Sequence, residues 1–253
     1  MQATLDLNCD LGEGFPHDAE LMPLITSANI ACGGHAGDAA TMKAAVALAL
    51  QHGVAIGAHP GFADRENFGR TALTMAPIDA ALMALQQIEA LREIVEAQGA
   101  TLRHVKLHGA LYHMAATNHG LADSIVRAMV VMERKLILFV PAGSVLESVA
   151  RTSGTLRVVN EVFADRTYQA DGLLTPRSQP NALIADEETA VAQVLRMVRD
   201  GIVRATDGTN ITMRTDTVSL HGDGPHAVDF ARRLNRELRA LGVGLKAPTA
   251  ESA

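Results

Sequence analysis

Acidic, imidazole and basic side chains recur in this chain at one kind of position, directly after short apolar runs. Carboxylates and imidazoles transfer protons or bind metal ions, and lysine and arginine bind carboxylate or phosphate groups. Residues so far apart in sequence act together only if the fold brings the ends of the runs to one place. The residues are Asp10, Glu13, His35, Asp38, His59, Lys106, His108, Glu161, Asp165, Arg166, His221 and Asp223.

Four of the histidines allow two interpretations. His35, His59, His108 and His221 are candidates for metal ligation or proton transfer, because a neutral imidazole suits both. The alternative is a hydrogen-bonded histidine with a purely structural role. Lys106 has a structural alternative too, an ion pair with a carboxylate, because a buried ammonium group needs one nearby.

Glycines accompany nearly all of these residues. The segment CGGHAGDAATM, which contains Gly33 and Gly34, resembles an anion cradle, because a glycine-rich turn entering a helix points backbone N–H groups at negative charge. The chain has no GxxxxGK[ST] loop and no GxGxxG motif after a strand. A nucleotide that binds here would therefore bind in a non-standard way.

The elements that must position these residues alternate along the whole chain. Helices are predicted at 39–51, 77–98, 121–133, 144–152, 187–200 and 225–241, the second with an apolar stripe that includes Ile78, Leu82 and Ile88. A hairpin excursion is predicted within 201–216, around Asp207 and Gly208. We predict one domain over residues 1–253, with seven strands at 4–9, 28–32, 54–58, 104–107, 136–140, 158–162 and 218–221.

Strands alternating with helices predict a parallel sheet, either open or closed into a barrel. Successive side chains of a strand point to opposite faces, so Asp6, Asn8 and Asp10 share one face of the first strand, and Lys106 lies on the equivalent face of the fourth. An open sheet with helices on both faces would bury these polar rows without compensation, whereas a barrel opens to a polar mouth. The pattern favours an α/β barrel, with Cys9 on the helix-facing side.

Composition excludes several classes of protein. Hydrophobic residues make up 48% of the 253, the formal net charge is −6, and no basic stripe typical of a nucleic-acid binder is visible. Cys9 and Cys32 form no disulfide framework and are predicted to be buried packing residues. No apolar stretch approaches the ~20 residues of a membrane span, and the start lacks the features of a secretion signal. We expect a cytoplasmic enzyme that binds neither nucleic acid nor membrane.

Several motifs of the chain, taken in order, resemble one known family. DLNCDLGEGF, ITSANIACGGHAGD, GVAIGAHPGFADRENFGR, VKLHGALYH, EVFADRTY and LHGD resemble the LamB/YcsF family, whose members form the A component of 5-oxoprolinase (ATP-hydrolysing). The resemblance runs from Leu5 to about Gly242. The chain departs from the family pattern at Gly34, where Phe is usual, and at Leu107 and His113, and these departures spare the ionisable candidates named above.

The resemblance implies a seven-stranded (β/α) barrel of the glycoside hydrolase/deacetylase type. It also implies cleavage of the cyclic amide 5-oxo-L-proline to L-glutamate, coupled to hydrolysis of ATP to ADP and phosphate, beside subunits B and C. Mg²⁺ or another divalent metal is a further expected cofactor, and the sequence leaves a homo-oligomer open. The expected catalytic residues are Asp10, Glu13, His59, Lys106, His108, Glu161 and His221. The expected substrate- or phosphate-binding residues are Asn8, Asn29, Gly33, Gly34, His35, Asp38, Arg166 and Asp223.

Two other functions fit the same residues. The first is a metal-dependent amide or carbohydrate deacetylase, with Asp10, His35 and His59 around the metal ion. The second is a non-catalytic component that keeps a ligand pocket. So many ionisable groups in one place argue against the second function, because unused buried charge costs stability.

Overall fold

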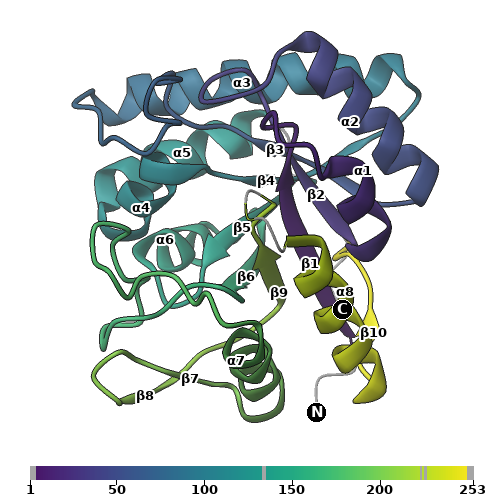
Figure 1. Cartoon of the computed structure of the whole chain (residues 1–253). Helices are drawn as coiled ribbons and strands as arrows, with labels where there is room; N and C mark the ends of the chain where they lie inside the picture. Colours follow the sequence, from purple (N-terminus) through teal and green to yellow (C-terminus); the bar gives the residue numbers. More distant parts are fainter. Residues whose placement is uncertain (1–3, 133–134, 223, 225–226, 250–253) are drawn as a thin grey trace.

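Seven parallel strands close into a barrel in the computed structural model, which describes residues 4–132, 135–222, 224 and 227–249 (Figure 1). The strand β9 pairs with both β6 and β1, which closes the sheet. This arrangement confirms the predicted (β/α) barrel. The barrel strands are β1 (Thr4–Leu11), β2 (Ser27–Ala31), β3 (Ala55–His59), β4 (Leu102–Lys106), β5 (Ile137–Pro141), β6 (Arg157–Phe163) and β9 (Thr217–Leu220).

Helices surround the barrel and pack on its outer surface (Figure 1). Local signals fix several ends: Asp38 caps α2 through the backbone N–H of Thr41, and Gly53 ends that helix in the left-handed conformation. The sequence did not predict α1, α4 or the short strand β10 (Gly244–Leu245) beside β1. The helices are α1 (Asp18–Leu21), the 3₁₀ turn η1 (Met22–Leu24), α2 (Ala39–His52), α3 (Pro77–Ala97), α4 (Gly109–Thr117), α5 (His119–Met132), α6 (Val145–Ser153), α7 (Glu187–Asp200) and α8 (Ala227–Ala240).

The predicted apolar stripe of α3 is wrong in its first half. Ile78 and Leu82 are exposed, and the buried face there consists of Ala80, Ala81 and Ala84. Small side chains allow close packing, so the helix turns its alanine face inward and leaves the larger residues outside. The second half packs as predicted, with Ile88 buried.

One excursion lies outside the barrel. An antiparallel hairpin of β7 (Ile202–Arg204) and β8 (Asn210–Thr212) lies within the segment predicted to leave the sheet. In the described part of the chain, no helix is long and apolar enough to cross a membrane.

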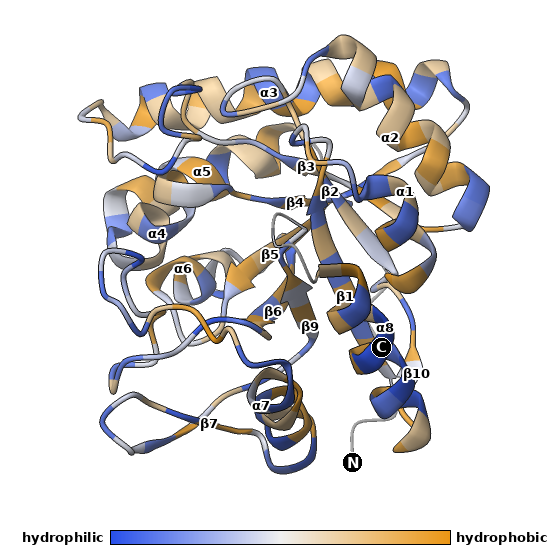
Figure 2. Cartoon of the chain, viewed as in Figure 1, coloured by the Kyte–Doolittle hydropathy of each residue, from blue (hydrophilic) through white to orange (hydrophobic). Residues whose placement is uncertain are grey.

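The barrel interior is polar on one side and apolar on the other. In Figure 2, β1 alternates between hydrophobic and hydrophilic residues, whereas β5 is mainly hydrophobic. Ile137, Phe139 and Val159 form a small apolar cluster inside, separate from the large core between the strands and the helices. Asp6, Asn8 and Asp10 of β1 and His104 and Lys106 of β4 lie on the interior face, as the alternation predicts, and their burial requires hydrogen-bond partners.

Candidate functional site

A cavity of about 540 Å³ opens at the carboxyl ends of the barrel strands. Residues at or just after the ends of β1, β3, β4, β6 and β9 line it, although long stretches of sequence separate them. The polar and charged residues that line it include Asp10, Glu13, His59, Arg70, Lys106, His108, Tyr112, His113, Glu161, Arg166, Gln169, Arg177, Ser178 and His221.

Lys106 forms the floor of the cavity with two carboxylates. Its Nζ lies 2.8 Å from Asp10 Oδ1 and 2.9 Å from Glu161 Oε1, and it donates to Ser219 Oγ at 2.8 Å. Glu161 Oε2 accepts the O–H of Tyr112 at 2.7 Å. The ion pairs expected as the structural alternative for Lys106 therefore exist, and they lie in the wall of the cavity.

The charges of this floor stabilise each other. Burial by itself lowers the pKa of Lys106, but Asp10 and Glu161 outweigh it and hold that pKa above its ordinary value. Burial raises the pKa of Asp10, but His59 and Lys106 outweigh it and hold the pKa well below its usual range. The floor is thus a charged network at neutral pH.

A layer of amides beneath the floor fixes its geometry. Asn29 Nδ2 donates to Asp10 Oδ1 at 2.8 Å and to Asn8 Oδ1 at 2.7 Å, and Asn29 Oδ1 lies 2.8 Å from His104 Nε2. A Cβ at Gly57 would lie 2.0 Å from His104 Nε2, so only glycine leaves room for that ring. Asn8 and Asn29, expected to bind substrate, do not line the cavity. Asn29 instead orients Asp10, and Asn8 Oδ1 accepts from Lys106 Nζ at 3.2 Å.

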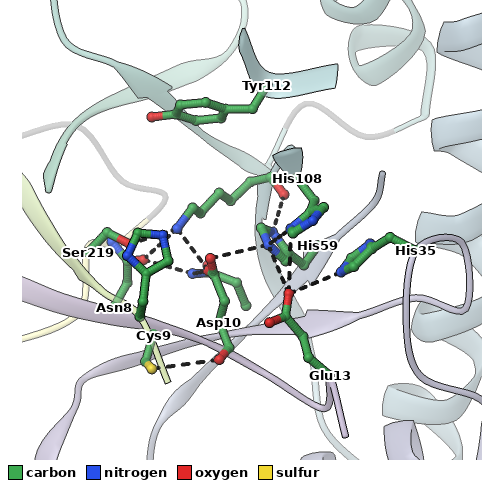
Figure 3. Close-up of polar contacts among 12 residues, drawn as sticks. Asn8, Cys9, Asp10, Glu13, His35, His59, His108, Tyr112 and Ser219 are labelled. Carbon is green, nitrogen blue, oxygen red and sulfur yellow. Dashed lines mark hydrogen bonds and ion pairs between the residues drawn. The ribbon is translucent and has the colours of Figure 1, made fainter. Parts of the chain in front are cut away.

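Three histidine rings gather around one carboxylate oxygen beside the floor. Glu13 Oε1 lies 3.1 Å from His35 Nε2, 3.8 Å from His59 Nε2 and 3.5 Å from His108 Nδ1 (Figure 3). The rings of His35 and His108 stack with centroids 3.6 Å apart. Asp10 Oδ2 lies 3.3 Å from His59 Nε2, which connects this cluster to the floor. Burial lowers the pKa of His35 to about 3 and that of His108 further.

The loop between β3 and α3 holds this cluster, and the sequence pattern assigned it no role. Phe68 has a positive φ of 55°, a conformation uncommon outside glycine, and its carbonyl oxygen lies 2.8 Å from His108 Nε2. A Cβ at Gly69 would lie 2.7 Å from the Cβ of His35, and one at Gly61 would lie 2.9 Å from His35 Nδ1. Glycine at these positions lets the loop close over the rings.

A histidine–carboxylate pair lies on another side of the cavity. His221 Nδ1 lies 2.8 Å from Asp165 Oδ2, and its Nε2 lies 3.1 Å from Nη2 of Arg177. His221 follows β9, and the path from β9 to β3 around the barrel passes β1 and β2 in one direction and β6, β5 and β4 in the other. His221 therefore faces the cavity from roughly the opposite side to His59.

Arg166 has a partly structural role. Its Nε donates to the carbonyl oxygen of Ala182 at 3.2 Å and its Nη2 to that of Thr175 at 2.7 Å, which ties together the segment between β6 and α7. Burial and the neighbouring Arg177 lower the pKa of Arg166 to about 10. Arg177 and Tyr112 also line the cavity, and neither residue was predicted from the sequence. Tyr112 lies one turn into α4, which follows the end of β4, and this position could have indicated that it reaches the cavity.

Gly33, Gly34 and Asp38, expected to bind substrate or phosphate, do not line this cavity. The N–H of Gly33 donates to the carbonyl oxygen of Ala36, and Asp38 is the exposed N-cap of α2. A Cβ at Gly34 would lie 2.4 Å from the side chain of Gln87, which bonds the backbone of Gly61, so Gln87 fills the space beside Gly34. Asp223 lies outside the described residues. The two cysteines, at positions 9 and 32, are buried, free thiols.

Comparisons with known proteins agree with the sequence motifs. The model of the LamB/YcsF family matches residues 5–253. A relative from Geobacillus kaustophilus, named as the A component of 5-oxoprolinase, is 50% identical over 98% of this chain and 98% of its own length. The crystal structure of a lactam utilization protein from Thermus thermophilus superposes with a TM-score of 0.90 at 42% identity, covering 97% of this chain and 100% of that one.

More distant structures share the fold alone. The catalytic domain of a peptidoglycan N-acetylglucosamine deacetylase from Eubacterium rectale superposes with a TM-score of 0.55 at 13% identity, covering 100% of this chain and 91% of that one. This likeness confirms the deacetylase-type barrel. The matches in sequence are far stronger and extend over nearly the whole chain, and by them the chain belongs to the LamB/YcsF family.

Proposed function

We propose that this chain is the hydrolase component of an ATP-dependent 5-oxoprolinase and opens the ring of 5-oxo-L-proline to give L-glutamate. One observation carries the proposal: a single cavity is lined by the charged floor of Asp10, Lys106 and Glu161 and by His221, whose Nδ1 contacts Asp165. The names of the relatives support the choice of substrate.

Opening a lactam requires attack of water on the carbonyl carbon, and the C–N bond breaks as the ring nitrogen takes up a proton. The ionised Asp10 carboxylate is positioned to accept the proton of the attacking water. His221 follows the neighbouring strand β9, and its Nδ1 is held by Asp165. In its protonated form, with Arg177 moved away from Nε2, His221 gives a proton to the leaving nitrogen. Lys106 and Arg177 supply positive charge for the substrate carboxylate or for the oxygen that becomes negative.

ATP enters the proposal through the chemistry of the substrate. An amide is a poor electrophile, and transfer of a phosphoryl group from ATP to its carbonyl oxygen releases ADP and makes a better target for water. Attack of water with cleavage of the C–N bond then leaves an acyl phosphate, and a second water releases phosphate from it to give glutamate. We propose that the phosphorylation step belongs to the complex with subunits B and C, because the sequence of this chain includes no standard phosphate-binding loop.

The test is an assay of glutamate release from 5-oxo-L-proline, with the purified chain alone and then with subunits B and C, with and without ATP. We expect ATP-dependent release of glutamate by the complex. In His221→Asn, the rate of release is expected to fall by roughly 10²–10⁴-fold, the range of general acid–base catalysis. His52→Asn, on an exposed residue at the end of α2, is the control and keeps the wild-type rate. Equal rates in His221→Asn and the control would remove His221 from the reaction. Release of acetate from an N-acetylated sugar without ATP would instead favour a deacetylase.

A further inference from the structure

The histidine cluster contains an arrangement of lone pairs that needs a positive charge. His59 Nδ1 lies 2.9 Å from the carbonyl oxygen of Lys106, and His108 Nε2 lies 2.8 Å from that of Phe68. A carbonyl oxygen only accepts hydrogen bonds, so each of these ring nitrogens carries the hydrogen. In the neutral rings, the other nitrogens, His59 Nε2 and His108 Nδ1, then present lone pairs.

These two lone pairs face each other across 2.9 Å. Glu13 Oε1 adds a third acceptor 3.5 Å from His108 Nδ1 and 3.8 Å from His59 Nε2. Neither neutral ring has a hydrogen to place between them, so the contact is repulsive unless one ring takes up a second proton or a metal ion lies among these atoms. The rings cannot simply turn away, because each is held by a backbone carbonyl and packed against the other.

We propose that Glu13, His35, His59 and His108 bind one divalent transition-metal ion in the wall of the cavity. One donor atom from each of the four lies within 4.8 Å of the other three. Two ligands that each lie about 2.1 Å from one Zn²⁺ ion are separated by roughly 3–4 Å, so small shifts bring the four into a common shell. Ligating histidines usually donate their second N–H to a carbonyl or carboxylate, as His59 and His108 do here.

The donor set selects the kind of metal. Three imidazoles and one carboxylate suit Zn²⁺, Fe²⁺, Co²⁺ or Ni²⁺, whereas Mg²⁺ prefers oxygen ligands. The set therefore favours a transition metal over Mg²⁺, and it differs from the ligands expected from the sequence in replacing Asp10 by Glu13 and His108. Asp10 keeps its ion pair with Lys106. A bound metal would supply a Lewis acid next to the carbonyl of a substrate in the cavity.

The test measures metal directly and does not depend on the proposed function. The full chain is treated with a chelator, desalted, and titrated with Zn²⁺, Co²⁺ or Mg²⁺, and bound metal is measured by plasma mass spectrometry together with the thermal unfolding midpoint. We expect one equivalent of Zn²⁺ or Co²⁺, a higher midpoint with Zn²⁺, and no stoichiometric Mg²⁺. Retention of no transition metal by the wild-type chain would overturn the proposal.

Two variants place the ion. Glu13→Gln and His59→Asn are expected to weaken Zn²⁺ binding by more than the roughly 10–100-fold that loss of an outer-shell partner costs. His221→Asn changes a cavity histidine outside the cluster and is expected to bind one full equivalent of Zn²⁺. If a variant fails to fold, the visible absorption of Co²⁺ bound to the wild-type chain reports whether histidine nitrogens are ligands. A Co²⁺ spectrum of a fully hydrated ion, or equal binding by folded cluster variants, would contradict the assignment. If His221→Asn binds metal like the wild-type chain but releases no glutamate, metal binding is shown independently of the proposed function, on which it does not depend.

Discussion

Lys106 Nζ lies 2.9 Å from Glu161 Oε1 although the two residues belong to β4 and β6, which are not adjacent in the barrel. The contact crosses the barrel interior and joins the charged floor of the cavity. Both side chains are buried, so neither charge is stabilised by bulk water. The stability of the fold and the chemistry of the cavity therefore depend on the same ion pair.

Replacing Lys106 by Met tests the contribution of this pair to stability. The change keeps a long apolar stem but leaves Asp10 and Glu161 buried without their cation. We expect the free energy of unfolding to fall by about 3–5 kcal/mol, measured by urea denaturation. The double variant Lys106→Met/Glu161→Gln, which also removes one of the stranded charges, is expected to recover part of the loss. A single variant as stable as the wild-type chain would show that the pair contributes nothing.

The glycine at position 69 tests how the loop over the histidine cluster is packed. Gly69→Ala places a methyl group 2.7 Å from the Cβ of His35 in a backbone with φ of 63°. Gly154→Ala is the matched control, because its φ is 62° and nothing lies within 4 Å of the added carbon. Both variants have the same backbone strain. The crowding in Gly69→Ala is expected to lower its free energy of unfolding by about 1–3 kcal/mol more than in Gly154→Ala. Equal losses of unfolding free energy in the two would exclude crowding of the rings.

Asp6 at the start of β1 predicts a dependence of stability on pH. Burial raises the pKa of Asp6 to about 6 from 3.8, against the hydrogen bonds from Thr217, Thr26 and Ser27. The folded chain thus binds the proton more tightly than the unfolded chain. This contribution is complete below about pH 4 and is lost as the pH rises through about 6, a change of roughly 3 kcal/mol.

The measurement for Asp6 compares the free energy of unfolding of the wild-type chain and Asp6→Asn between pH 4 and pH 7. The difference between the two chains isolates this group from the other carboxylates. We expect the wild-type chain to lose stability relative to the variant as the pH rises. Parallel pH profiles would contradict the raised pKa.

The sequence predicted the barrel and much of its floor because side chains alternate along strands. The alternation in β1 placed Asp10 inside, and that in β4 placed Lys106 inside, so a meeting of the two followed from closure of the sheet. The loop containing Phe68 and Gly69 could not be predicted in this way, because no periodic pattern describes a loop whose form depends on the rings it covers. Arg177 was missed for the same reason, since it lies in the irregular segment between β6 and α7.

The grouping of histidines was also only partly predictable. Strand ends indicated that His35, His59 and His108 share one rim, but not which carboxylate they surround. Glu13 lies beyond the end of β1, and its position depends on the turn at Gly12 and Gly14, both with positive φ. The sequence favoured Asp10 as the partner, whereas the structure places Glu13 Oε1 within 3.8 Å of all three rings.

The rate of ATP-dependent glutamate release by the complex reassembled with Asp10→Asn tests the central claim most directly. Asparagine has nearly the same shape as aspartate but cannot accept the proton of the attacking water, so folding and assembly are retained and kcat falls by roughly 10²–10⁴-fold. A complex that contains the folded variant and turns over 5-oxo-L-proline at close to the wild-type rate would contradict the assignment of the chemistry to this cavity.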